Sequence, residues 1–357
     1  MKAGIYNISN GVKSGARASN MELLRIVSMM MVLAVHFDGA ALGLPELKGN
    51  IGNANFVDVW RLAVEALVII GVNCFTLISG YFGIKLRIRS ICNFLFECVF
   101  YSVGIYTCLS FFTPEGFSIT KWIESWLVLT HTDLWYVPAY FFLMLLSPFL
   151  NAGFAALSRN KMLWVTLLFL LFNLWAGWWW EGRFNPTGYT VVQLILMYMI
   201  GGCVRKYNDQ QVETPARFRN RLIVLWLGLY VAFSFLTTLY SFYNPLKAFA
   251  YNSPFVIGAS VAFFLAFMVM KFQSRTINYA AKSAFAVYLI HKSPLVWGGI
   301  IKKNVESLWL HTNVVEFSVY AIIAIFAIYI LCMMIDWLRR LIFALLSQNR
   351  FFMTSLN

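Results

Sequence analysis

The chain is short of charge. Only 12% of its 357 residues are Asp, Glu, Lys or Arg, whereas about a quarter of the residues in a soluble domain are charged. Hydrophobic residues make up 60% of the sequence, and its mean hydropathy is +0.70. This composition excludes an ordinary soluble enzyme and a disordered chain, and it predicts a membrane protein.

Closely paired cysteines are also missing. None of the six cysteines belongs to a C-x-x-C pair, and all six lie in apolar stretches: Cys74, Cys92, Cys98, Cys108, Cys203 and Cys332. A disulfide framework or a zinc site requires cysteines at characteristic spacings. We therefore expect no disulfide framework and no bound metal.

Long apolar runs fill the chain instead. A helix needs about 20 mostly apolar residues to cross a bilayer, and this criterion predicts an all-α polytopic membrane protein with ten transmembrane helices. Small residues occur in pairs in two of these segments, at Ser79-Gly80 and Gly201-Gly202, which predicts close helix packing there. The predicted spans are 22–43, 59–84, 91–113, 134–157, 162–180, 189–204, 222–242, 252–270, 279–300 and 313–338.

Basic residues are distributed unevenly between the loops. If the amino terminus is cytoplasmic, 20 of the 28 Lys and Arg residues lie on the cytoplasmic side, as the positive-inside rule requires. An even number of spans returns the carboxyl terminus to the same side, so both termini are predicted to be cytoplasmic. The expected organisation is a tail over 1–21, a ten-helix domain over 22–338 and a second tail over 339–357. Topology thus accounts for most of the net charge of +13, and no nucleic-acid partner is expected.

Several ionisable residues fall inside the predicted spans. Burying such a side chain in a membrane is costly, so ionisable residues found there commonly have a function. Arg25 and His36 are eleven residues apart, which is about three helical turns, so they share one helix face at about 16 Å separation. Arg25 is either a snorkelling anchor or a ligand-binding cation. His36 is either a functional group or a packed residue with a polar partner. Glu65 and Glu97 also need partners. Each is either a member of a structural ion pair or a carboxylate in a cavity, and the sequence does not choose between the two.

An ordered set of motifs resembles the membrane acyltransferase-3 family, which includes O-acetyltransferases of bacterial surface polysaccharides. The family's first span usually opens with Asp-x-x-Arg, and this chain has Glu at the acidic position. The matching segments, in chain order, are Glu22-x-x-Arg25 with His36, Phe75–Tyr81 with its Ser-Gly-aromatic end, Leu134–Val137 and Ser283–His291.

The resemblance implies an O-acetyltransferase of the cell membrane, in a bacterium the plasma membrane. Its donor would be acetyl-CoA, reached from the cytoplasm, and its acceptor a hydroxyl of a cell-surface or lipid-linked glycan. The catalytic role carries over to His36 and the essential cation role to Arg25. Histidine suits this chemistry either as a general base on the acceptor hydroxyl or as a transient acyl carrier, and both routes stay open.

Further residues are candidates for binding the two substrates. We expect Lys85, Arg87 and Arg89 to join Arg25 in binding the phosphates of CoA, although a positive-inside loop would look the same. The candidate acceptor-binding residues each have a structural alternative. His291 either contacts the acceptor or forms a hydrogen bond between helices. Trp135 and Tyr136 either stack on a sugar or belong to an interfacial aromatic belt. Asp38 either orients or charges the imidazole of His36 at the acceptor site, or is an exposed surface carboxylate.

A different class of protein fits the same composition. A lipid-linked glycan flippase or other transporter also needs many spans, a basic inner face and buried ionisable residues. It does not need the set of Glu22, Arg25 and His36 with the downstream motifs, so we place it second. A glycan polymerase would need large outer loops, and the outer loops here are short.

Overall fold

The computed structural model describes residues 18–47, 52, 54–180, 183–208 and 215–348 of the chain. The regular structure in these ranges consists of helices without strands, so the predicted all-α class is confirmed. Parts of both predicted tails, residues 1–17 and 349–357, lie outside the described residues. The last helix runs on to Gln348, ten residues beyond the predicted end of the membrane domain at 338.

The first half of the chain forms α1 (Ser19–Val35), α2 (Phe56–Val68), α3 (Gly71–Phe82), α4 (Ile88–Leu109), α5 (Ile119–Glu124), α6 (Tyr136–Ala156) and α7 (Arg159–Phe172). The second half forms α8 (Val191–Asn208), α9 (Ala216–Ser241), α10 (Pro245–Ala248), α11 (Pro254–Val269), α12 (Arg275–Ala280), α13 (Ala284–His291), α14 (Pro294–Val296), α15 (Lys302–His311) and α16 (Val314–Gln348). Short π-helical segments continue α1 at His36–Ala40 and α7 at Asn173–Trp179, and a third links α14 to α15 at Trp297–Ile301.

Fewer helices meet the requirements of a membrane span than the ten predicted. Seven described helical segments are long and apolar enough, or eight if the bent pair Arg275–His291 and Pro294–His311 forms one span. Of the other two predicted spans, α11 has only 16 residues, fewer than a straight crossing needs. The 18-residue α8 ends in a polar segment that includes Arg205 and Lys206. The prediction of ten spans is therefore not confirmed.

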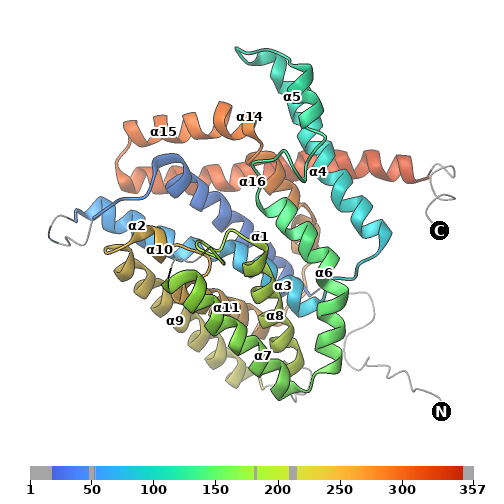
Figure 1. Cartoon of the computed structure of the whole chain (residues 1–357). Coiled ribbons are helices and arrows are strands. Elements are labelled where there is room, and N and C mark those ends of the chain that lie inside the picture. Colours follow the sequence, from blue (N-terminus) through green and yellow to red (C-terminus); the bar gives the residue numbers. More distant parts are fainter. Residues whose placement is uncertain (1–17, 48–51, 53, 181–182, 209–214, 349–357) are drawn as a thin grey trace.

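Helix α1 lies at the centre of the bundle, where α2, α3, α11, α12, α13 and α16 all contact it. Helix α9 lies beside α11, α15 runs alongside α16, and the segment that carries α5 projects from the rest (Figure 1). Helix α4 packs against α13. The two ends of α1 define the two ends of the bundle, which we call the Arg25 end and the His36 end. At the Arg25 end, Asn20 donates to the carbonyl oxygen of Phe267 near the end of α11, and Ser19 donates to Gln273 in the segment after it.

Helices α3 and α8 pack with their backbones almost in contact. A Cβ atom added at Gly80 would lie 2.1 Å from the carbonyl oxygen of Tyr198, and one added at Gly201 would lie 2.4 Å from that of Leu77. Neither distance is sterically possible, so only glycine fits at these two positions. The predicted close packing is confirmed, and it fixes α3, one wall of the cavity described next.

Candidate active site

A cavity of about 800 Å³ opens beside α1 and extends along most of its length. One face of α1 lines it through Arg25, Met29, Val32 and His36, whose spacing of three and four residues keeps the side chains on one side of a helix. Arg25 and His36, which periodicity predicts to share a face, therefore also share one cavity. A single ligand of sufficient length can contact both.

The Arg25 end of the cavity carries two cations. Arg25 forms an ion pair with Glu22, at 3.0 Å between Nη1 and Oε2, which holds the guanidinium in place from one side. Lys282, in the turn between α12 and α13, lines the same cavity. Two cations at one end of a cavity favour an anionic group such as a phosphate.

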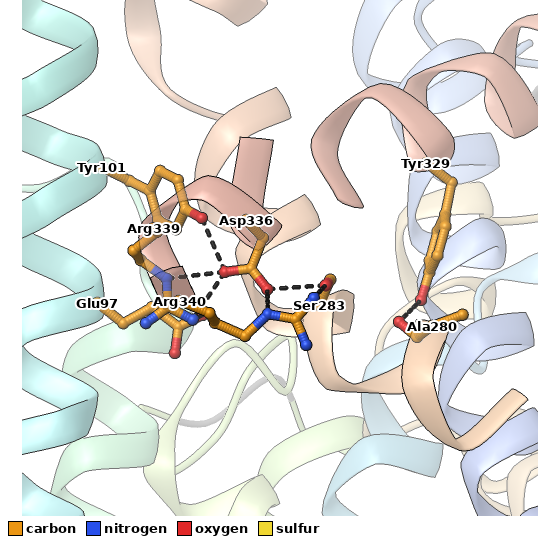
Figure 2. Close-up of polar contacts among 8 residues, drawn as sticks. All are labelled: Glu97, Tyr101, Ala280, Ser283, Tyr329, Asp336, Arg339 and Arg340. Carbon is orange, nitrogen blue, oxygen red and sulfur yellow. Dashed lines mark hydrogen bonds and ion pairs between the residues drawn. The ribbon is translucent and has the colours of Figure 1, made fainter. Parts of the chain in front are cut away.

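A buried ionic network holds the segment that carries Lys282 (Figure 2). Asp336 of α16 accepts hydrogen bonds from Tyr101 (2.9 Å), Ser283 (2.7 Å) and Arg339 (2.7 Å). Arg340 pairs with the same carboxylate at 3.1 Å, and Tyr329 donates to the carbonyl of Ala280 at 3.1 Å. Helix α16 thus hydrogen-bonds to Ala280 and Ser283, which flank the two cavity residues 281 and 282.

Glu97 belongs to this network. Its carboxylate lies 3.4 Å from Arg339, which gives the in-span glutamate the partner that the sequence could not identify. The pair joins α4 to α16. Glu97 is not among the residues that line the cavity, so its place in the fold is structural.

His36 occupies the first position of a π-helical segment, a local widening of the helix that is frequent at functional sites. Its Nδ1 atom lies 2.9 Å from Nε2 of His291, although 255 residues separate the two in sequence. The ring of Trp297 packs 5.5 Å from the His36 ring, centroid to centroid. His36 is thus held between α13 and the π-helical segment that Trp297 begins.

The hydrogen bonds of His291 determine which nitrogen of His36 is free. Nδ1 of His291 lies 2.6 Å from the carbonyl oxygen of Val287, and a carbonyl can only accept, so this nitrogen carries the proton. In a neutral imidazole the other nitrogen is then an acceptor. Nδ1–H of His36 therefore donates to Nε2 of His291, and Nε2 of His36 keeps its lone pair. This tautomer is the one that a general base or a nucleophile requires.

The His36 end of the cavity has an aromatic wall made by Trp135, Tyr189 and Tyr251. Their ring centroids lie 4.6 Å apart for Tyr189 and Tyr251, 5.0 Å for Trp135 and Tyr189, and 5.9 Å for Trp135 and Tyr251. Tyr136, the next residue after Trp135, also lines the cavity. Both predicted aromatic residues thus face the cavity, not only the surface of the bundle.

Buried amides hold the two loops that carry this wall. Asn73 and Gln193 both donate to the carbonyl oxygen of Tyr251, at 3.0 and 2.8 Å. The backbone NH of Tyr251 donates to the carbonyl oxygen of Thr187 at 3.0 Å. Buried and satisfied amide networks are rigid, so the aromatic wall is formed before any ligand binds.

Other predicted site residues lie away from the cavity. Asp38 is buried and pairs with Arg61, at 2.6 Å between Oδ1 and Nε. His291 is fully buried behind His36. Three predicted cations are exposed on the segment that follows α3 at the Arg25 end: Lys85, Arg87 and Arg89.

Several cavity residues have no role in the sequence analysis, among them Lys282, Lys292, Glu65, Tyr189 and Tyr251. The sequence did mark Glu65 as unusual, because it is an acidic residue inside an apolar run. Lys282 looks like any other positive-inside residue, and the two tyrosines come from loops whose approach depends on tertiary structure. In the described part of the chain, no group of three or more His, Cys, Asp or Glu residues is placed to hold a metal ion.

Comparison with known proteins gives one match. A family model described as an acyltransferase domain matches residues 19–337, which includes every cavity residue named above. No curated protein and no solved structure matches the chain.

Proposed function

The chain belongs to the acyltransferase-3 family of membrane acyltransferases, and from this premise we propose that it transfers an acetyl group from cytoplasmic acetyl-CoA to a hydroxyl of a cell-surface or lipid-linked glycan. The observation that carries the proposal is the single cavity that contains both Arg25 and His36. The family membership confirms the resemblance drawn from the sequence motifs. The donor, the acceptor and the roles of individual residues are the proposal.

The donor enters from the Arg25 end, which faces the cytoplasm. Arg25 and Lys282 bind the phosphates of CoA, and the exposed Lys85, Arg87 and Arg89 attract the nucleotide to the mouth of the cavity. The extended pantetheine arm then follows the face of α1 over about 16 Å, the rise of eleven helical residues. This places the thioester beside His36 while the charged nucleotide stays at the membrane surface.

Acyl transfer then proceeds at Nε2 of His36. This nitrogen takes the proton of the acceptor hydroxyl, whose oxygen attacks the thioester carbonyl. The carbon–sulfur bond breaks, and the CoA thiolate receives the proton from His36, so the products are an acetyl ester and CoA. His291 is a positioning residue in this scheme, because it accepts the Nδ1 proton of His36 and keeps Nε2 available.

The alternative of a transient acetyl-histidine uses the same nitrogen as a nucleophile. Rapid quenching of the protein with [14C]acetyl-CoA and no acceptor separates the two routes. Label on the wild-type chain that is absent from His36→Ala supports the covalent route. An unlabelled chain that still transfers acetyl to an added acceptor supports the direct route.

The experiment that tests the function uses purified protein in nanodiscs with [14C]acetyl-CoA and a hydroxylic acceptor. We expect His36→Ala to abolish transfer, while His311→Ala retains it, because His311 is exposed and, among the described residues, hydrogen-bonds to Ser307 of its own helix. Near-normal transfer by His36→Ala contradicts the proposal. Glycan transport by the wild type without thioester consumption would instead favour the flippase.

A further inference from the structure

Glu65 is the cavity residue with the least explained chemistry. It lies in α2, its side chain is only 2% exposed, and it lines the cavity. Among the residues that the structure describes, its Oε2 atom has no hydrogen-bond partner. A buried carboxyl oxygen without a hydrogen bond is costly. Oε2 itself is shielded from solvent, so a ligand in the cavity would bind the other oxygen, Oε1, which lies against the cavity residue Gly39.

The position of this carboxylate relative to His36 is set by Gly39. A Cβ atom added at Gly39 would lie 3.1 Å from Oε1 of Glu65, so the carboxylate packs directly against the glycine. Gly39 is three residues after His36 and lines the same cavity. Glu65 therefore lies about one helical turn beyond the imidazole, on the side away from Arg25 and from the donor.

The aromatic wall faces the same end of the cavity. Trp135, Tyr189 and Tyr251 present ring faces and edges there, and Tyr189 is 46% exposed. Burial raises the pKa of Tyr251 well above its ordinary value, and the nearby Tyr189 and Glu65 add to the rise. The Tyr251 hydroxyl therefore keeps its proton. Flat rings suit the apolar face of a pyranose, and a carboxylate accepts hydrogen bonds from its hydroxyls.

We propose that Glu65 and the aromatic wall form the acceptor subsite, which selects a pyranose with at least two free hydroxyls. One hydroxyl donates to the Glu65 carboxylate, and a second hydroxyl of the same ring faces Nε2 of His36. The ring lies against the aromatic wall, which rigid loops hold in place. This inference rests on the proposed acetyl transfer and adds the class of acceptor and the residue that orients it.

The selection of a second hydroxyl gives a sharp test, because a monohydric alcohol cannot use Glu65. The probes are methyl α-D-glucoside, methyl α-D-galactoside, methyl α-D-mannoside and cyclohexylmethanol, each titrated against the full-length protein in nanodiscs with [14C]acetyl-CoA. For the best glycoside, we expect Glu65→Gln to lower kcat/KM by about 10-fold, as for a lost hydrogen bond to a buried carboxyl group. The KM for acetyl-CoA and the transfer to cyclohexylmethanol should stay at wild-type values.

Two further variants complete the design. Gly39→Ala keeps the carboxylate but adds a methyl group 3.1 Å from it, and we expect the same selective loss with the glycoside. Glu46→Gln makes the same change of charge at an exposed residue outside the cavity lining, and we expect wild-type kinetics.

The outcomes separate this inference from the proposed function. Equal losses of Glu65→Gln with the glycoside and with cyclohexylmethanol overturn the acceptor subsite, and so does an unchanged glycoside kcat/KM. Wild-type transfer to cyclohexylmethanol but to none of the glycosides also overturns it, and leaves acetyl transfer standing. A wild-type protein that acetylates none of the four probes contradicts the proposed function itself.

Discussion

Substituting His291 tests whether this buried residue controls the reactivity of His36. His291→Leu removes the acceptor of the Nδ1 proton and fills a fully buried site with an apolar side chain of suitable size. The Nδ1–H group of His36 is then left without its partner, which costs about 1–3 kcal/mol. If that cost falls on the orientation of the ring in the transition state, kcat decreases about 5- to 150-fold.

The assay is the initial rate of [14C]acetyl transfer at saturating acetyl-CoA, with the donor KM measured in parallel. A positioning role predicts a lower kcat with an unchanged donor KM, because the phosphates that anchor the donor bind at the other end of the cavity. His291→Gln should recover part of the loss, since its amide oxygen can accept the same proton. Thermal unfolding in detergent reports whether each variant folds. A well-folded His291→Leu with wild-type kcat would refute the positioning role.

Two other predictions concern the donor site and the fold. Arg25→Gln should raise the KM for acetyl-CoA about 10- to 150-fold, as expected for a lost charged hydrogen bond of about 1.5–3 kcal/mol. The control is Arg217→Gln at an exposed position of α9, which should leave this KM unchanged. Equal KM values for both variants would contradict phosphate binding by Arg25. Gly80→Ala should lower the unfolding temperature and the yield of folded protein, because its methyl group would lie 2.1 Å from a backbone oxygen of α8. The control Gly104→Ala places its methyl group within 4 Å of no atom and should be neutral. Equal stability of the two variants would contradict the close packing of α3 and α8.

The sequence was most informative where the signal is local. Apolar runs located helical segments at all ten predicted positions, and helical periodicity placed Arg25 and His36 on one face. The number of spans was harder to predict, because α8 and α11 are close to the minimum length and hydropathy of a membrane-crossing helix. The break after His291 has a visible cause in the sequence, because Pro294 is the first residue of a new helix and Ser293 is its N-cap. The two helical halves meet at 70°.

The candidate site was harder to predict because its partners are distant in sequence. The contact between His36 and His291 spans 255 residues, and nothing in either local pattern reveals it. Asp38 is close to His36 in sequence, yet its partner is Arg61 of α2. Tyr189 and Tyr251 reach the cavity from loops that buried amides hold, and neither loop has a periodic pattern.

The most direct test of the shared cavity is a cryo-EM structure of the protein in nanodiscs with the non-transferable thioether analogue of acetyl-CoA. The account predicts density that runs along α1, with the phosphates at Arg25 and Lys282 and the acetyl end beside Nε2 of His36. Nucleotide density anywhere outside this cavity, or an acetyl end remote from His36, would contradict it.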